Sequence, residues 1–75
     1  MFTSIKTHNI RALLLTLGSE SDLPSYRYSQ LDRGVYVAAQ RLSPKVAADM
    51  AISVGISVKS AIKLIQLAQR DNSIS

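Results

Sequence analysis

The most informative part of this sequence is residues 43–70, SPKVAADMAISVGISVKSAIKLIQLAQR. Ser43 followed by Pro44 is typical of a helix start, because serine caps free N–H groups and proline is favoured at the first helical position. Gly55 then interrupts the helical pattern, and glycine is favoured just after a helix ends. Ser57 provides a second cap. The stretch therefore predicts two helices joined by a Gly-Ile-Ser turn, the second helix running to about residue 70.

The small and apolar residues around this turn have the spacing of a DNA-binding motif. Ala51, four residues before Gly55, places a small side chain where two helices would cross. The flanking core positions and the inner face of the second helix are filled by Met50, Val54, Ile56, Ala61 and Leu64. Residues 47–66 therefore resemble helix-turn-helix DNA-binding regulators. The resemblance implies that the second helix enters the major groove of DNA.

The second of these helices also has a basic stripe. Lys59, Lys63, Gln66 and Arg70 are spaced i, i+4, i+7 and i+11, and no acidic residue occurs from position 55 to position 70. Lysine can contact phosphates or guanine and glutamine can bind adenine, so the stripe suits a major groove. The alternative is an ordinary solvated face. The candidate DNA-binding residues are Ser57, Val58, Lys59, Lys63, Gln66, Arg70, Lys45 and Arg41.

A second resemblance, also within DNA binding, is to ribbon-helix-helix repressors. Residues 42–62 are similar to that family in their capped helix, Gly-hydrophobic-Ser turn and second helix with isoleucine. The resemblance implies that residues 36–41 form a strand that enters the groove. The bases would be contacted by Val37, Ala39 and Arg41. Two departures weigh against it: the first helix is about one turn shorter than the family prefers, and Gln40 would point into the core face.

Residues 4–17 are expected to form an N-terminal helix that packs and dimerises. Ser4 or Thr7 would cap its start, and Gly18 would occupy the C-cap position. Its leucines extend around most of the helix, and a helix this apolar needs more than one partner. A domain of 75 residues is also marginally stable alone. The expected dimer contacts are Ile10, Leu13, Leu14 and Leu17.

Residues 26–41 admit two interpretations. Apolar residues from Leu31 to Leu42 repeat with helical spacing. Gly34 interrupts that pattern, however, and a β-hairpin of two short strands turning near this glycine is the alternative. We favour a helix, because the Ala-Ala-Gln-Arg sequence that ends the segment has poor strand propensity.

The sequence predicts a single domain of the mainly α class with three to four short helices. Its 75 residues leave no room for a second core. Residues 26–70 would form the helical DNA-binding unit. A polar connector at residues 19–25 precedes it, in which Pro24 disfavours helix. Residues 71–75 are expected to be a frayed tail.

Composition argues against several functional classes. The net charge of +4 belongs to residues 26–75, while the first 25 residues are neutral, and this asymmetry favours a polyanionic partner. There is no cysteine and only one histidine, His8, so no metal site is expected. Acidic residues occur singly, and no Gly-rich phosphate loop or nucleophile elbow is present; we therefore expect no enzyme, cofactor or small-molecule substrate. No apolar run, such as residues 12–15, approaches the ~20 residues of a membrane span, which favours a cytoplasmic protein.

The preferred functional hypothesis is a small homodimeric transcriptional regulator that binds double-stranded DNA. It would be similar to the repressors and accessory factors of phages and plasmids. The alternative is a protein–protein interaction module, such as an adaptor, inhibitor or antitoxin-like protein, whose basic helix docks on an acidic protein. Both hypotheses depend on the same helix and the same packing.

Overall fold

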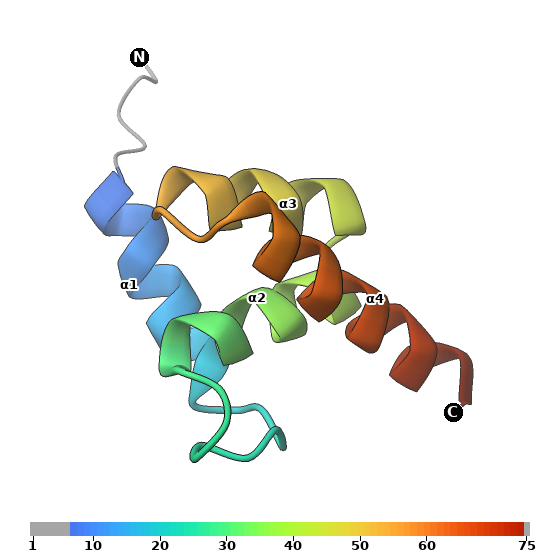
Figure 1. Cartoon of the computed structure of the whole chain (residues 1–75). Coiled ribbons are helices and arrows are strands. Elements are labelled where there is room, and N and C mark those ends of the chain that lie inside the picture. Colours follow the sequence, from blue (N-terminus) through green and yellow to red (C-terminus); the bar gives the residue numbers. More distant parts are fainter. Residues whose placement is uncertain (1–6, 75) are drawn as a thin grey trace.

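The computed structural model describes residues 7–74, with side chains from residue 9 to residue 72. This part of the chain forms four helices and no strand (Figure 1). Their bounds are α1 (Thr7–Gly18), α2 (Gln30–Arg41), α3 (Pro44–Ser53) and α4 (Val58–Ile74). The predicted mainly α class is therefore confirmed. None of these described helices is both long and apolar enough to cross a membrane.

Helix α1 begins within the predicted N-terminal helix, and helix α2 occupies most of the segment that had two interpretations. The predicted N-terminal helix began at residue 4, and Ser4 lies outside the described residues. Thr7, the other candidate cap, is the first residue of α1. Residues 30–41, for which a hairpin was the alternative, form helix α2, and the segment before them turns through hydrogen bonds to the carbonyl of Pro24.

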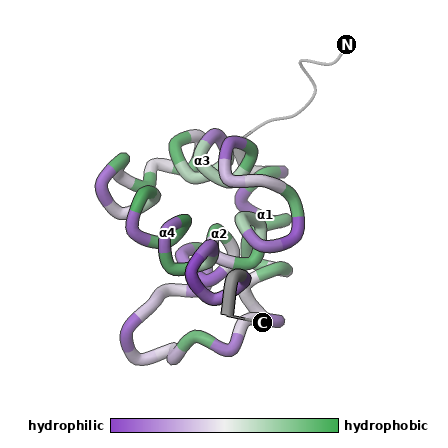
Figure 2. Tube along the Cα trace, turned by 90° about the vertical axis from the view of Figure 1, so that its right-hand side faces the viewer, coloured by the Kyte–Doolittle hydropathy of each residue, from purple (hydrophilic) through white to green (hydrophobic). Residues whose placement is uncertain are grey.

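Helix α2 is the central element of the fold. It contacts α1, α3 and α4, whereas α1 and α4 do not contact each other within the described residues. Figure 2 shows α2 between α1 and α4, beneath α3. The residues of α2 from Gly34 to Ala39 are consecutively buried. A helix buried on all sides has no alternation of polar and apolar residues, and this explains why the sequence pattern of this segment was ambiguous.

The hydrophobic core draws side chains from all four helices. Leu14 of α1 and Val35 of α2 are its largest fully buried side chains. Many of the other core residues are alanines, which let the helix backbones approach one another closely. The buried core consists of Leu14, Val35, Tyr36, Val37, Ala38, Ala39, Ala47, Met50, Ala51, Ala61, Leu64 and Ala68.

Helices α1 and α2 cross at very short range, through two glycines. A Cβ atom on Gly34 would lie 2.0 Å from the carbonyl oxygen of Leu14 and 2.9 Å from its Cα atom. A Cβ atom on Gly18 would lie 2.1 Å from the carbonyl oxygen of Gln30. The Gln30 side chain strengthens the crossing, because its Nε2 donates a hydrogen bond to the Leu15 carbonyl at 2.7 Å. At both positions, a residue larger than glycine would collide with the backbone of the neighbouring helix.

The predicted role of Gly18 as a C-cap is wrong. Gly18 is the last residue of α1 and is buried, and among the described residues only Gly55 has a positive φ angle. Its small size is explained by the contact with Gln30 rather than by a left-handed backbone. The sequence alone does not distinguish these two uses of a glycine at a helix end.

The predicted helix start at Ser43 and Pro44 is confirmed. Ser43 is the N-cap of α3, where its Oγ accepts a hydrogen bond from Val46 N at 3.1 Å, and Pro44 occupies the first turn. Ser29 caps α2 in the same manner, through a 3.1 Å bond from Asp32 N. These caps satisfy N–H groups that have no partner within the helix.

The C-terminal end of α4 differs from the prediction. Helix α4 continues through residues 71–74, past its predicted end near residue 70, and Ser75 lies outside the described residues. The physical reason is an anchor on α2: the buried Tyr36 hydroxyl donates a hydrogen bond to Oδ2 of Asp71. Burial, together with this bond, raises the pKa of Tyr36 from 10.0 to about 12.

Candidate nucleic-acid interface

The turn between α3 and α4 is stabilised by two backbone hydrogen bonds. Gly55 N donates to the carbonyl of Ile52 at 3.1 Å, and Ile56 N donates to the carbonyl of Ala51 at 3.0 Å. Gly55 has a φ angle of 89°, so the turn is a Schellman motif with glycine in the left-handed position, as the sequence predicted. Ser57 then starts α4, with its Oγ accepting a hydrogen bond from Ser60 N at 3.2 Å.

The residues on which the helix-turn-helix resemblance depends lie between α3 and α4 or against the core. Ala51 and Ala61 are 0% and 2% exposed, so the two helices pack through small side chains. Met50 and Leu64 are also buried. Val54 and Ile56, on either side of the glycine, are partly buried and contact the core. This packing fixes the direction of α4 relative to α3.

The opposite side of α4 faces solvent. We define the outer face of α4 as six residues, all of them exposed: Val58, Lys59, Ile62, Lys63, Gln66 and Arg70. The buried residues Ala61, Leu64 and Ala68 lie on the inner side of the same helix. In Figure 1, α4 lies on the outside of the molecule, with α2 and α3 on one side of it only. The predicted basic stripe is thus part of an exposed surface.

The electrostatics of the outer face are dominated by cations. Within residues 9–72, neither Lys59 nor Lys63 forms an ion pair. Arg70 lies near a carboxylate, with its Nε 3.7 Å from Oδ1 of Asp71. That same Asp71 side chain accepts the hydrogen bond from Tyr36. The two lysines in the first half of α4 therefore carry charge that no ion pair within residues 9–72 neutralises.

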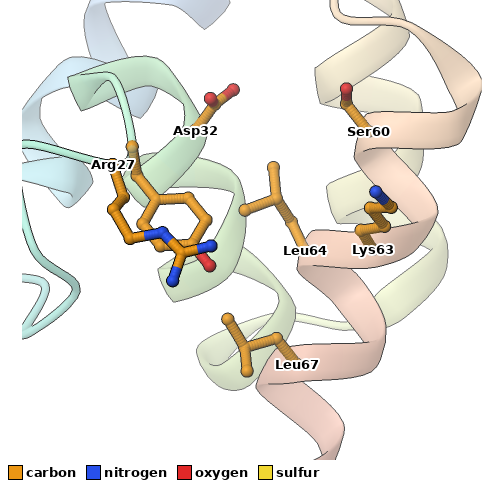
Figure 3. Close-up of a pocket in the computed structure, with 7 residues that line it drawn as sticks. Arg27, Asp32, Ser60, Lys63, Leu64 and Leu67 are labelled. Atoms are coloured by element: carbon orange, nitrogen blue, oxygen red, sulfur yellow. The ribbon is translucent and has the colours of Figure 1, made fainter.

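A small hollow adjoins this face, between α4 and the start of α2 (Figure 3). Its volume is about 240 Å³. Figure 3 shows Arg27 on one side and Lys63 on the other, with Leu64 projecting between them. The guanidinium of Arg27 lies 5.9 Å from the centre of the Tyr28 ring, a cation–π contact. The full lining is Arg27, Tyr28, Asp32, Ser60, Lys63, Leu64 and Leu67.

Arg27 is a candidate residue that is not among the predicted duplex-binding residues. It lies in the connector before α2, where helical spacing gives no signal, and only the fold brings it opposite Lys63. Asp32 also lines the hollow and offsets part of the positive charge there. The cationic surface therefore extends from α4 to a second segment of the chain.

Two predicted DNA-binding residues lie elsewhere. Arg41 ends α2, and its Nη1 lies 2.5 Å from Oε1 of Glu20. Lys45 lies in the first turn of α3, with its Nζ 3.3 Å from Oδ2 of Asp49. Each of these cations thus has a carboxylate partner, and both lie at the end of α3 remote from the Gly55 turn.

The four predicted dimer contacts on α1 are placed unequally. Leu14 is fully buried inside the single chain. Ile10 and Leu17 are partly buried and pack against the same core. Leu13 is 47% exposed and is the member of this set that a second subunit can reach most readily.

The strand required by the ribbon-helix-helix interpretation is not formed, because residues 36–41 belong to α2. The geometry in the described residues is instead two packed helices, a glycine turn and an exposed cationic face on the second helix. Comparison of the chain with protein families, with curated proteins and with solved structures gave no match.

Proposed function

We propose that this protein is a small DNA-binding regulator that inserts α4 into the major groove of double-stranded DNA. An α-helix with side chains is about 10–12 Å across and the B-form major groove is about 12 Å wide, so the two are complementary in size. The outer face of α4 would point to the base edges. The packed turn at Gly55 would hold that helix at a fixed angle to the rest of the subunit.

The observation that carries this proposal is the presence of two lysines without an ion-pair partner on an exposed helix face. Lys59 and Lys63 are exposed and form no ion pair in the described residues, and positions 55–70 contain no acidic residue. DNA binding is largely driven by neutralisation of phosphates by such side chains. Arg27, across the hollow from Lys63, would contact a phosphate on the flank of the groove.

The regulator is proposed to act as a homodimer, similar in this respect to small phage and plasmid repressors. Two copies would place two α4 helices on neighbouring turns of one face of the duplex, about 34 Å apart. Leu13 on α1 is the exposed apolar residue that supports a contact at that helix. Sedimentation of the protein at increasing concentration tests this part, and a monomer throughout the concentration range would remove it.

The DNA-binding part is tested by titrating labelled duplex with the protein at two salt concentrations. The double variant Lys59→Glu, Lys63→Glu should abolish the retardation of duplex while leaving the helical circular dichroism signal unchanged. A single Lys63→Gln variant should reduce the slope of log K against log salt by about 0.9, the contribution of one phosphate contact.

Arg11 provides a matched control for the effect of charge. It is an exposed cation on α1, and helix α1 does not contact α4 in the described residues. Arg11→Glu changes the net charge by the same amount as Lys63→Glu. Only Lys63→Glu should weaken duplex binding strongly. Equal losses for both variants would show that overall charge, and not the outer face of α4, governs the affinity. Tight binding of an acidic polypeptide with no binding of duplex would favour a protein-interaction module instead.

A further inference from the structure

The outer face of α4 is not uniformly basic. Val58 and Ile62 are 62% and 48% exposed, although both are branched apolar residues. They lie one helical turn apart, and Gln66 continues the same row after another turn. Lys59 and Lys63 form the adjacent row. The face therefore consists of an apolar row ending in an amide, with a row of positive charge beside it.

This arrangement restricts what can bind. A partner must offer negative charge along one side and small apolar groups beside it. A second copy of the same face does not fit, because the lysines of both copies would be brought together. The major groove fits, because phosphates border it and the C5-methyl group of thymine is the apolar group among its base edges.

We infer that Val58 and Ile62 contact thymine methyl groups, so that the protein prefers duplexes with thymines opposite the first two turns of α4. This inference rests on the proposed DNA binding and specifies its target. Gln66, next in the row, would form its hydrogen bonds with adenine at N6 and N7, which also favours A·T pairs. The lysines contact the phosphates and contribute affinity that does not depend on the base sequence.

The test uses the full chain and replaces thymine by uracil. A preferred duplex is first selected from a randomised pool, and each thymidine in it is then replaced in turn by deoxyuridine. The replacement removes one methyl group but leaves the charge and the base-pairing groups unchanged. We expect Kd to rise about fourfold for each methyl group in contact with the protein, the effect of losing one buried methyl group.

Two variants assign the effect to particular side chains. Each side chain is expected to contact the methyl group of one particular thymine. When that side chain is replaced, in Ile62→Ala or Val58→Ala, the change of its thymine to uracil should no longer affect Kd. The salt dependence of binding should stay that of the original protein. Both positions are exposed, and alanine is the better helix former, so the fold should be retained. Ile52→Ala on α3 is the matched control, because Ile52 is 49% exposed. This control should discriminate thymine from uracil as the original protein does.

The possible outcomes are distinct. Salt-dependent duplex binding with no loss at any uracil position overturns the methyl-contact inference but leaves the proposed function in place. Retention of the full uracil effect in both alanine variants also overturns it. Absence of duplex binding by the original protein removes the proposed function and this inference with it. Altered sedimentation of Ile62→Ala with unchanged DNA affinity would assign Ile62 to a subunit interface and contradict the inference.

Discussion

The α1–α2 crossing and the α3–α4 turn each depend on a glycine, but for opposite reasons. At the crossing, a Cβ atom on Gly34 would collide with backbone atoms of Leu14. At the turn, a Cβ atom on Gly55 would meet nothing within 4 Å. Glycine is favoured there because the backbone has a φ angle of 89°. One glycine provides space between two backbones, and the other provides a conformation that L-residues rarely adopt.

The fold is therefore sensitive to side-chain volume at one of these two sites and not at the other. The α1–α2 crossing cannot accept an added methyl group without moving backbone atoms. The α3–α4 turn has open space around it, so a substitution there strains only the local backbone. The two sites should therefore respond to the same glycine-to-alanine change with losses of different size.

The largest effect is expected for Gly34→Ala. The new Cβ would lie within 3 Å of three backbone atoms of Leu14, so α1 and α2 must separate. We expect a loss of about 3 kcal/mol in the free energy of unfolding, even though alanine is the better helix former. Urea denaturation followed by circular dichroism measures the loss. A small loss would show that the helices can separate at little cost.

Gly55→Ala should have a smaller effect, about 1–2 kcal/mol, because the residue must keep a left-handed conformation without any steric clash. Gly55→Asn should cost less than Gly55→Ala, since asparagine tolerates that conformation better. The same denaturation experiment applies. The comparison of the two regions would fail if Gly55→Ala cost as much as Gly34→Ala.

Tyr36→Phe tests the hydrogen bond that fixes the end of α4 to α2. Loss of the bond to Asp71 should cost about 1 kcal/mol at neutral pH. Because the folded-state pKa of Tyr36 is raised from 10.0 to about 12, its contribution is complete below pH 10 and is lost as the pH rises from 10 to 12. The original protein should therefore lose stability more steeply in that range than Tyr36→Phe. Tyr26→Phe, at an 86% exposed position, is the control and should match the original protein.

The smallest effect is expected for Arg41→Ala, which removes the ion pair with Glu20. This pair also joins α2 to the turn that follows α1, but its side chains are 55% and 48% exposed. Exposed pairs contribute less than about 1 kcal/mol, and added salt should reduce the effect further. Thermal unfolding at low and high salt measures it. A loss as large as that of Gly34→Ala would mean that charge, rather than close backbone approach, holds α1 against α2.

Much of the fold was predictable because its signals are local. Ser43 and Pro44 mark a helix start through their own chemistry, and Gly55 marks the turn in the same way. The α2 segment was harder to predict, because its buried run from Gly34 to Ala39 lacks a polar side. The continuation of α4 beyond residue 70 depends on Tyr36, 35 positions away from Asp71, and no local pattern contains that information.

The same distinction between local and long-range signals holds for the candidate interface. The exposure of Lys59 and Lys63 follows from helical periodicity. The pairing of Arg41 with Glu20 and the position of Arg27 beside the hollow both arise from contacts between segments distant in sequence. Val58 was among the predicted DNA-binding residues and Ile62 was not, whereas the structure places both on the same exposed face as the lysines.

The outer face of α4 has a consequence for how this protein can change. All six of its residues are exposed, so the packing of the four helices does not constrain their identity. Under the proposed function, recombination or targeted randomisation at these positions would therefore alter binding preference while the scaffold persists. A lineage built on this chain could acquire new targets through few substitutions, each of them nearly neutral for folding.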